Sequence, residues 1–351
     1  MSIHKLESNV GGKADAARSA KAAQRPATPR RRVTLGVIVG NRGFFPGHLA
    51  ATGRLDILRA LEEVGIDAVI VEAAATNHGA IESRDEAKLC AALFREHRDR
   101  IDGVLVTLPN FGDERAVADT LRMAGLDVPV LVHATSDDPS KMLIDHRRDA
   151  FCGKMSVCNV LTQYGIRYSL TSTHTQHPDS PGFRRDLQSF AAVCRVVKGL
   201  RGARIGAIGA RPAAFKTVRY SEKILERAGI SVEPIDLSEI LGRIARLADG
   251  DAGVRQKLEE MTAYVDTSGV PDEPLLKMAK LGYVMDTWMQ EVDVTISAVQ
   301  CWTSMEEYFG VVPCTIMSML SNANLPSACE VDVMGTISMH ALALASETPA
   351  A

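Results

Sequence analysis

Four carboxylates near the end of the chain have the types and spacing to hold a metal ion. Glu306 and Glu307 follow an apolar run, and Glu330 and Asp332 follow two small residues. Carboxylates that converge repel one another unless a cation joins them. Hard oxygen ligands in this number suit Mn²⁺ or Mg²⁺. The alternative from spacing alone is that all four lie on solvated helix ends.

The elements that must position these acids alternate apolar strands with helices. Residues 33–39, VTLGVIV, form a continuous apolar run, which is typical of a strand buried on both faces. Strands alternating with helices predict a parallel sheet covered by helices on both faces. The first unit is predicted to contain strands at 33–39, 67–71, 102–108 and 128–132 and helices at 51–64, 84–97 and 114–123.

A second unit of the same kind follows. Its predicted strands are 204–208, 231–235 and 292–299, and the last of them leads to Glu306. The fold class is therefore α/β, with two successive parallel-sheet units of flavodoxin- or Rossmann-like type. The boundary between the units is placed at 165/166. Ligands of such sheets bind beyond the carboxyl ends of the strands. The loops there are rich in Asn, His, Thr and Asp, which suits a polyhydroxylated ligand.

Composition excludes several classes of protein. A hydrophobic fraction of 46% and a charged fraction of 24% are ordinary for a globular protein. No apolar run approaches the roughly 18 residues of a membrane helix. The seven cysteines are scattered without a C-x-x-C motif, which predicts reduced thiols and a cytoplasmic location.

The charge of the chain is unevenly distributed. Residues 1–32 carry eight Lys or Arg against Glu7 and Asp15, a net charge of +6. The whole chain carries −3, so the remainder carries −9. The first 32 residues have few large apolar side chains and are predicted to form a disordered basic tail. An acidic body argues against nucleic acid as the main partner.

Five stretches of the sequence resemble the L-fucose/L-arabinose isomerase superfamily, and more closely its shorter fucose-isomerase-like branch. The resemblance covers about residues 33–346, and the last two stretches are the specific ones. They are 37–43, 209–217 (GARPAAFKT), 236–240 (DLSEI), 300–310 (QCWTSMEEYFG) and 328–335 (ACEVDVMG).

The resemblance implies a metal-dependent aldose–ketose isomerase with Mn²⁺ as cofactor and Mg²⁺ or Co²⁺ as alternatives. Its metal ligands would be Glu306, with Glu307 as the weaker choice, and either Glu330 or Asp332. A carboxylate at the metal removes the C2 proton of the sugar, and the resulting enediolate is reprotonated at C1. Glu306, Glu330 and Asp332 are therefore the predicted catalytic and metal-binding residues.

The resemblance also implies a sugar pocket and an assembly. Arg42, Gln300 and Trp302 would help to form the pocket for a small-molecule sugar. Members build their sites between subunits, so the chain is expected to form a homo-oligomer, either a trimer or a hexamer, with the loop of Arg42 reaching a neighbour's metal site.

One departure from the family concerns the third metal ligand, a histidine from a C-terminal domain. Only 19 residues follow Asp332, and residues 327–351 would be the start of that domain, truncated. His340, on an apolar helix, is expected to be a packing residue. The shortened chain is predicted to show weak or no turnover. A non-catalytic sugar-binding or regulatory relative, and an unrelated two-domain α/β binding protein, remain as alternatives.

Overall fold

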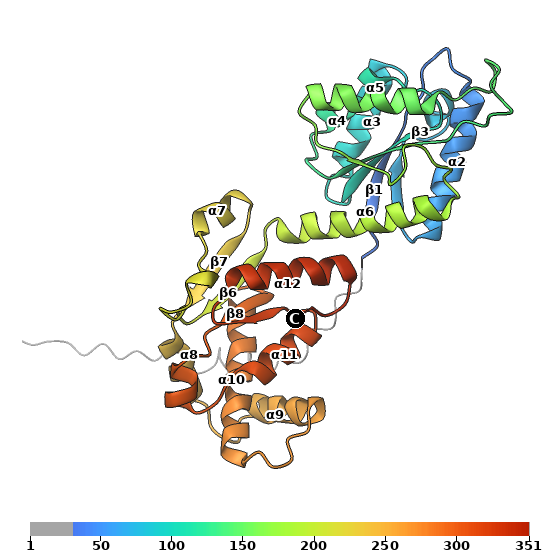
Figure 1. Cartoon of the computed structure of the whole chain (residues 1–351). Coiled ribbons are helices and arrows are strands. Elements are labelled where there is room, and N and C mark those ends of the chain that lie inside the picture. The colour runs from blue at the N-terminus through green and yellow to red at the C-terminus, as the bar shows by residue number, and fades with distance from the viewer. Residues whose placement is uncertain (1–30, 351) are drawn as a thin grey trace, which may run out of the picture. The chain divides into compact units, whose positions relative to one another are not determined.

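The structure is a computed structural model that describes residues 31–350. These residues divide into two compact units, 31–198 and 199–350 (Figure 1). The predicted basic tail, residues 1–32, lies outside the described residues except for Arg31 and Arg32. These two arginines are not a free tail, because Arg31 forms an ion pair with Asp102 and Arg32 pairs with Asp67 at 3.2 Å.

The unit of residues 31–198 contains one parallel five-stranded sheet in the order β2-β1-β3-β4-β5. This is the flavodoxin-like order, in which the direction of winding reverses between β1 and β3. Its strands are β1 (Thr34–Val39), β2 (Asp67–Ile70), β3 (Gly103–Leu108), β4 (Val130–Ala134) and β5 (Ser169–Leu170). Its helices are α2 (Gly47–Glu63), η2 (Asn77–Gly79), α3 (Arg84–Glu96), α4 (Glu114–Ala124), α5 (Ala150–Gln163) and α6 (Pro181–Leu200).

Alternating side chains of β1 explain why this sheet is apolar on both faces. Ile38 packs in one core with side chains of α3, α4 and α5, while Val37 and Val39 pack in the other with side chains of α2 and α6. Successive residues of a strand point to opposite faces, so a strand covered on both sides must be apolar throughout. The continuous apolar run at 33–39 is therefore explained by the burial of both faces of β1.

The unit of residues 199–350 contains a parallel four-stranded sheet in the order β7-β6-β8-β9. This is the same order of winding as in the first unit, one strand shorter. Its strands are β6 (Arg204–Ile208), β7 (Ser231–Ile235), β8 (Ile296–Val299) and β9 (Ser327–Cys329). Its helices are η3 (Lys216–Val218), α7 (Glu222–Arg227), α8 (Leu237–Ala245), α9 (Ala252–Tyr264), α10 (Asp272–Glu291), η4 (Met305–Phe309), α11 (Cys314–Asn322) and α12 (Val333–Ser346).

Two cores cover the faces of this second sheet. Side chains of α8, α9, α10 and α11 pack with Ile208 and Val299, and side chains of α7 and α12 pack with Ile205 and Ile296. The predicted fold class, two successive parallel-sheet α/β units, is confirmed. No helix among the described residues is long and apolar enough to cross a membrane.

The structure divides the chain later than the predicted boundary at 165/166. β5 pairs with β4 and α6 packs on the first sheet, so residues 166–198 complete the first unit. Residues 327–351, predicted to begin a third domain, instead supply the edge strand β9 and the covering helix α12 to the second sheet, as far as residue 350. A two-residue strand carries too weak a pattern for the sequence to show which sheet it joins.

Candidate functional site

The carboxyl ends of β8 and β9 bring two of the sequence motifs together. Val299 and Cys329 pair in register, so the residues that follow them leave the sheet side by side. Gln300, Cys301 and Trp302 follow β8, and Glu330 follows β9. The edge is the one at which parallel sheets bind their ligands. The main-chain amide of Trp302 donates a hydrogen bond to Glu330 Oε1 at 3.2 Å, which joins the two segments directly.

Gln300 fixes the loop that carries Trp302. Its Nε2 donates to the carbonyl of Trp302 at 3.0 Å, and its Oε1 accepts from the amide of Ala210 at 2.8 Å. Gly209 lies between these segments with φ +84°, and a Cβ there would approach Gln300 Oε1 to 2.4 Å. Only glycine meets both requirements without strain. The motif beginning at residue 209 and the motif beginning at residue 300 are therefore parts of one edge.

Trp302 presents an aromatic surface beside this edge. Half of its side chain is exposed, and its ring centroid lies 5.1 Å from that of Phe215. Aromatic faces of this kind pack against the apolar C–H faces of ligands while leaving polar groups at the rim. Phe215 belongs to the motif at 209–217 and was not among the predicted site residues.

Glu330 carries the clearest sign of a ligand site in this unit. Its Oε1 accepts hydrogen bonds from the amide of Trp302 and the thiol of Cys301, whereas its Oε2 is buried and has no hydrogen-bond partner among residues 31–350. Glu330 and Val331 both adopt φ +55°. Left-handed backbone is unfavourable for a β-branched residue, so the packing of buried Val331 must hold the turn. A buried carboxylate oxygen without a donor is a natural position for a cation.

Two thiols flank the Glu330 carboxylate. Cys301 Sγ lies 2.9 Å from Cys329 Sγ, and both contact Glu330 Oε1. Burial, then the neighbouring Cys329 and Glu330, raises the pKa of the Cys301 thiol. Burial also raises the pKa of Cys329. No positively charged side chain in the described part of the chain lowers the pKa of either thiol, so both thiols remain protonated at neutral pH. Neither was identified from the sequence, although the motifs at 300–310 and 328–335 contain one cysteine each.

The other predicted acids do not join this cluster. Among the described residues, one group of three potential metal-ligating side chains lies within 4.8 Å, and it consists of Cys301, Cys329 and Glu330. Glu306 lies exposed on the short helix η4. Asp332 is the N-cap of α12, where its Oδ1 accepts from the amide of Gly335 at 2.8 Å.

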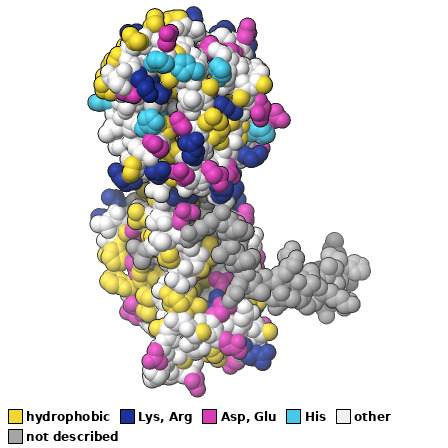
Figure 2. All heavy atoms as spheres, turned by 90° about the vertical axis from the view of Figure 1, so that its right-hand side faces the viewer, with side chains coloured by type: hydrophobic (Ala, Val, Ile, Leu, Met, Phe, Trp, Pro, Cys, Tyr) yellow, Lys and Arg dark blue, Asp and Glu magenta, His cyan; other side chains and the backbone are white. Residues whose placement is uncertain are grey.

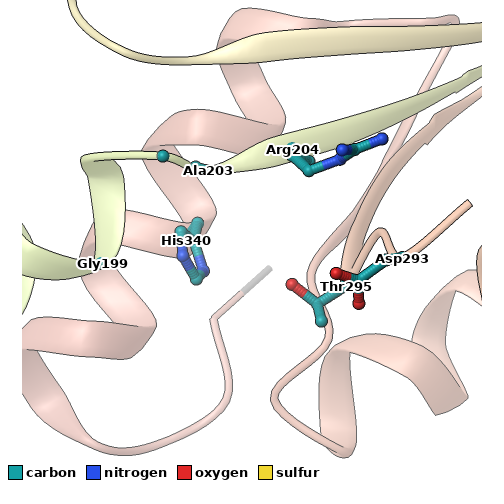
Figure 3. Close-up of a pocket in the computed structure, with 7 residues that line it drawn as sticks. Gly199, Ala203, Arg204, Asp293, Thr295 and His340 are labelled. Atoms are coloured by element: carbon teal, nitrogen blue, oxygen red, sulfur yellow. The ribbon is translucent and has the colours of Figure 1, made fainter.

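His340, which was expected to be a packing residue, lies at the edge of the sheet opposite to Glu330. It lines a pocket of about 220 Å³ with Gly199, Arg204, Asp293 and Thr295 (Figure 3). Arg204 begins β6 and Thr295 directly precedes β8, so the pocket is at the amino ends of the strands. Burial lowers the pKa of the His340 imidazole. The pocket is therefore distinct from the edge that bears Glu330.

Arg42 lies in the unit of residues 31–198, in the loop after β1. Its guanidinium forms ion pairs with Asp113 and Glu114 and stacks 4.5 Å above the ring of Phe111. Its Nε is buried 4.0 Å from Asp113 Oδ2 and makes no hydrogen bond to any described residue. The loops after β1 and β3 meet here, at the point where the sheet reverses its winding. Such switch points are the usual ligand sites of doubly wound sheets.

Several other buried polar atoms near this edge lack a partner. Asn41 and Asn110 are fully buried, and the Oδ1 atom of each is unsatisfied. Arg54 Nη1 and Thr135 Oγ1 are also buried without a hydrogen bond to any described residue. Buried polar atoms are usually hydrogen-bonded, so a set of this size indicates a hydrogen-bonding ligand or water. The sequence signal was the Asn-rich loops at the strand ends, but periodicity could not tell which asparagines were buried.

The two parallel sheets, each with polar side chains at the carboxyl ends of its strands, are those of α/β proteins that bind small ligands at this edge of the sheet. Residues 36–201 match the family model for the N-terminal domain of fucose/sulfoquinovose isomerase. The match nearly coincides with the first compact unit. The resemblance to the fucose-isomerase-like branch of the L-fucose/L-arabinose isomerase superfamily is thus confirmed.

Individual relatives carry the same family label. Sulfoquinovose isomerases of Priestia aryabhattai and Priestia megaterium are each 24% identical to this chain over 246 residues, which is 70% of this chain and 53% of theirs. That of Alkalicoccus urumqiensis is 25% identical over 195 residues, which is 55% of this chain and 43% of its own. The chain spans about half the length of the curated relatives that it matches.

Proposed function

We propose that the chain belongs to an aldose–ketose sugar isomerase that works through an enediolate and depends on a divalent cation, Mn²⁺ in the first instance, with Mg²⁺ and Co²⁺ as alternatives. The single observation that supports it best is the buried, unpartnered Oε2 of Glu330 at the ligand edge of the second sheet. The similarity to sulfoquinovose isomerases supports the class of reaction.

The donor set fits a hard cation in part. Glu330 offers a buried oxygen that nothing else satisfies, and Glu306 offers an exposed carboxylate. Asp332 uses one oxygen in the helix cap, which leaves the other for a ligand. In this proposal Glu306, Glu330 and Asp332 hold the ion, which when bound stabilises the negative charge that develops on the sugar oxygens.

Proton transfer, contact with the sugar and positioning of the Trp302 loop are assigned to different side chains. A carboxylate of this set accepts the proton from C2 of the aldose and returns a proton to C1, which is general base and then general acid catalysis. Trp302, with Phe215 beside it, packs against an apolar face of the sugar. Gln300 holds the Trp302 loop through its two amide hydrogen bonds, so we assign it a positioning role in the pocket.

Arg42 and its surroundings would supply hydrogen bonds to hydroxyl or anionic groups of a sugar. The unsatisfied oxygens of Asn41 and Asn110 accept hydrogen bonds, and the buried nitrogens of Arg42 and Arg54 donate them. Such a mixed set matches a polyhydroxylated ligand. Sulfoquinovose, the substrate in the names of the relatives, is therefore the first substrate to test, beside L-fucose and L-arabinose.

The decisive experiment joins metal binding to turnover. Mn²⁺ binding is measured by electron paramagnetic resonance for the unchanged chain, for Glu306→Gln and for the matched control Glu307→Gln. We expect weaker binding in Glu306→Gln alone, and ketose formation from at least one of the three sugars. Equal Mn²⁺ binding by all three proteins would remove Glu306 from the proposed site.

A non-catalytic sugar-binding relative is the second candidate, and a specific observation favours it. Asp332 already caps α12, and Glu306 is outside the cluster around Glu330 among the described residues. The two candidates differ in one measurement. Saturable binding of a sugar without any ketose product in the presence of Mn²⁺ would select the binding protein.

A further inference from the structure

The donors that meet at Glu330 are chemically different from the three acids proposed above. Cys301 Sγ and Cys329 Sγ lie 2.9 Å apart, and Glu330 Oε1 contacts both sulfur atoms. One atom of each residue lies within 4.8 Å of the others. Two sulfurs and one carboxylate oxygen already face one another, and changes of side-chain rotamer that move them apart would let them share an ion.

The Cys301–Cys329–Glu330 cluster is buried on one side and open to solvent on the other, as a binding site requires. Cys301 is 4% exposed, which keeps water from one side of the cluster, while Cys329 is exposed and opens it to solvent. Glu330 Oε2 is buried and has no hydrogen-bond donor. That carboxylate is therefore short of positive partners in the absence of a cation, independently of the two thiols.

We propose that Cys301, Cys329 and Glu330 bind a thiophilic divalent cation of the Zn²⁺ class. Thiolate sulfur selects Zn²⁺ over Mn²⁺ and Mg²⁺, which prefer oxygen. Three protein ligands leave the fourth position of a tetrahedral ion to water or to a ligand. On binding, each thiol gives up its proton to water, so two protons leave for each ion taken up.

Such a complex keeps one net negative charge. Two thiolates and one carboxylate carry three negative charges, and the divalent ion offsets two of them. The same three groups without an ion would repel one another, and the thiols therefore hold their protons. The ion supplies the positive charge that the buried Glu330 oxygen lacks.

The proposal gives Glu330 a second partner. If Glu330 also serves the proposed isomerase site, a thiophilic ion withdraws it from that site and competes with Mn²⁺. This consequence rests on the proposed function, whereas the Cys301–Cys329–Glu330 site does not. The two ideas can therefore fail separately.

The test uses Co²⁺ as an optical probe for the thiophilic ion, with the full chain in a phosphine reductant that keeps thiols free. Coordination by thiolate produces an intense sulfur-to-Co²⁺ charge-transfer band in the near ultraviolet, and Zn²⁺ in equimolar amount abolishes it. We expect one Co²⁺ per chain. Cys301→Ser and Cys329→Ser should each lose most of the band, and Glu330→Gln should weaken binding about tenfold or more.

The control is Cys152→Ser, an exposed free cysteine in the other unit, which should keep the full band. Cys314 is not used as a control because its charge contributes to the raised pKa of Cys329. Absence of the band in the unchanged chain, or its survival in Cys301→Ser, would overturn the proposal. Circular dichroism of each variant shows that loss of the band is not loss of fold.

A second pair of measurements separates this site from the proposed function. Mn²⁺ binding is measured with and without one equivalent of Zn²⁺. If the band forms but Mn²⁺ does not bind in either condition, the isomerase site fails and the thiolate site stands. If Mn²⁺ binds and Zn²⁺ neither forms the site nor reduces Mn²⁺ binding, the thiolate site fails alone.

Discussion

His133 illustrates how burial sets the charge of a single side chain. It is fully buried on β4, where Thr107 Oγ1 lies 3.0 Å from its Nδ1 and its Nε2 lies 2.9 Å from the carbonyl of Gln176. A neutral ring satisfies both contacts, with Nε2 donating and Nδ1 accepting. Burial lowers the pKa of His133 from 6.5 to about 4. The imidazole is therefore neutral in the folded protein at neutral pH.

This lowered pKa predicts a loss of stability in mild acid. Between pH 6.5 and about 4 the unfolded chain binds a proton at His133 that the folded chain does not. The free energy of unfolding should therefore fall as the pH falls through this window, by at most roughly 3 kcal/mol from this group. Above pH 6.5 the group should have no effect.

The measurement is chemical unfolding of the chain and of His133→Gln across this range. The variant should lose this part of the pH dependence. The pKa of His133 is also measured directly by NMR titration of the unchanged chain, which does not depend on the stability of the variant. A His133 pKa near 6.5 in the folded chain would contradict the prediction.

Among the elements, α5 shows how a single glycine permits close packing. A Cβ at Gly153 would lie 1.6 Å from the carbonyl oxygen of Phe111, in the loop that follows β3. The helix therefore lies directly against the main chain at the carboxyl edge of the first sheet. Neither partner is a flexible side chain, so neither can move aside cheaply.

Gly153→Ala should destabilise the unit of residues 31–198 by about 2 kcal/mol or more, because the added carbon forces backbone apart. The matched control is Gly242→Ala in α8, where a Cβ meets nothing within 4 Å. That change should be neutral or stabilise by up to roughly 1 kcal/mol through helix propensity. Thermal unfolding of both variants gives the comparison, and equal stability of the two would show that the α5 contact is not as close as described.

Helix α12 depends on its cap as well as on its apolar contacts. Asp332 caps its first turn, Thr336 Oγ1 donates to the carbonyl of Ser297 at 2.9 Å, and Val333 is fully buried. Met334 and Leu342 remain 44% and 59% exposed on the same helix. Figure 2 shows apolar side chains gathered on the face of residues 199–350 that it displays. The helix is therefore part of the second unit and adds apolar surface to it.

Asp332→Ala should lower the free energy of unfolding by about 0.5–2 kcal/mol, because the amide of Gly335 loses its acceptor. Asp332→Asn keeps an acceptor and should cost only a few tenths. Both are measured with a chelator present, so that any role of Asp332 in metal binding does not contribute. If Asp332→Asn lowered the free energy of unfolding more than Asp332→Ala does, the negative charge at this position, and not the helix cap, would be the source of stability.

At the scale of the whole molecule, the proposed function assigns roles to Arg42 in one unit and to Glu330 in the other. Each lies at the carboxyl edge of its own sheet. The proposed isomerase needs both, and the family resemblance would place the loop of Arg42 at the metal site of a neighbouring subunit. Assembly would then be a condition for activity.

We therefore predict a homo-oligomer, a trimer or a hexamer, in solution. Light scattering gives the mass, and a monodisperse species of 37.9 kDa would contradict the prediction. Mixing Arg42→Ala with Glu330→Gln tests the shared site. If sites form between subunits, mixed oligomers should recover activity that each variant lacks alone.

Local sequence was sufficient for the order and type of most elements, but not for the edge strand β9. Residues 204–208 and 231–235 were predicted as strands with the observed limits, and the apolar run at 33–39 became β1. Such runs reflect burial of both faces of a parallel sheet, which is a property of each segment by itself. The family resemblance, and not the spacing, gave Gln300 and Glu330 as predicted site residues, and the pairing of β8 with β9 brings them to one edge of the sheet. The boundary between units was missed because β5 is two residues long and joins a sheet whose other strands precede it.

Contacts between distant segments were decided by tertiary structure alone. Residues 301 and 329 became neighbours because β8 and β9 pair in register, and a side chain's distance from another strand is not encoded in its local pattern. The cap role of Asp332 and the unsatisfied oxygens of Asn41 and Asn110 likewise depend on neighbours supplied by other segments. Residue types and their spacing thus defined the candidate acids, whereas packing selected which atoms stand together at Glu330.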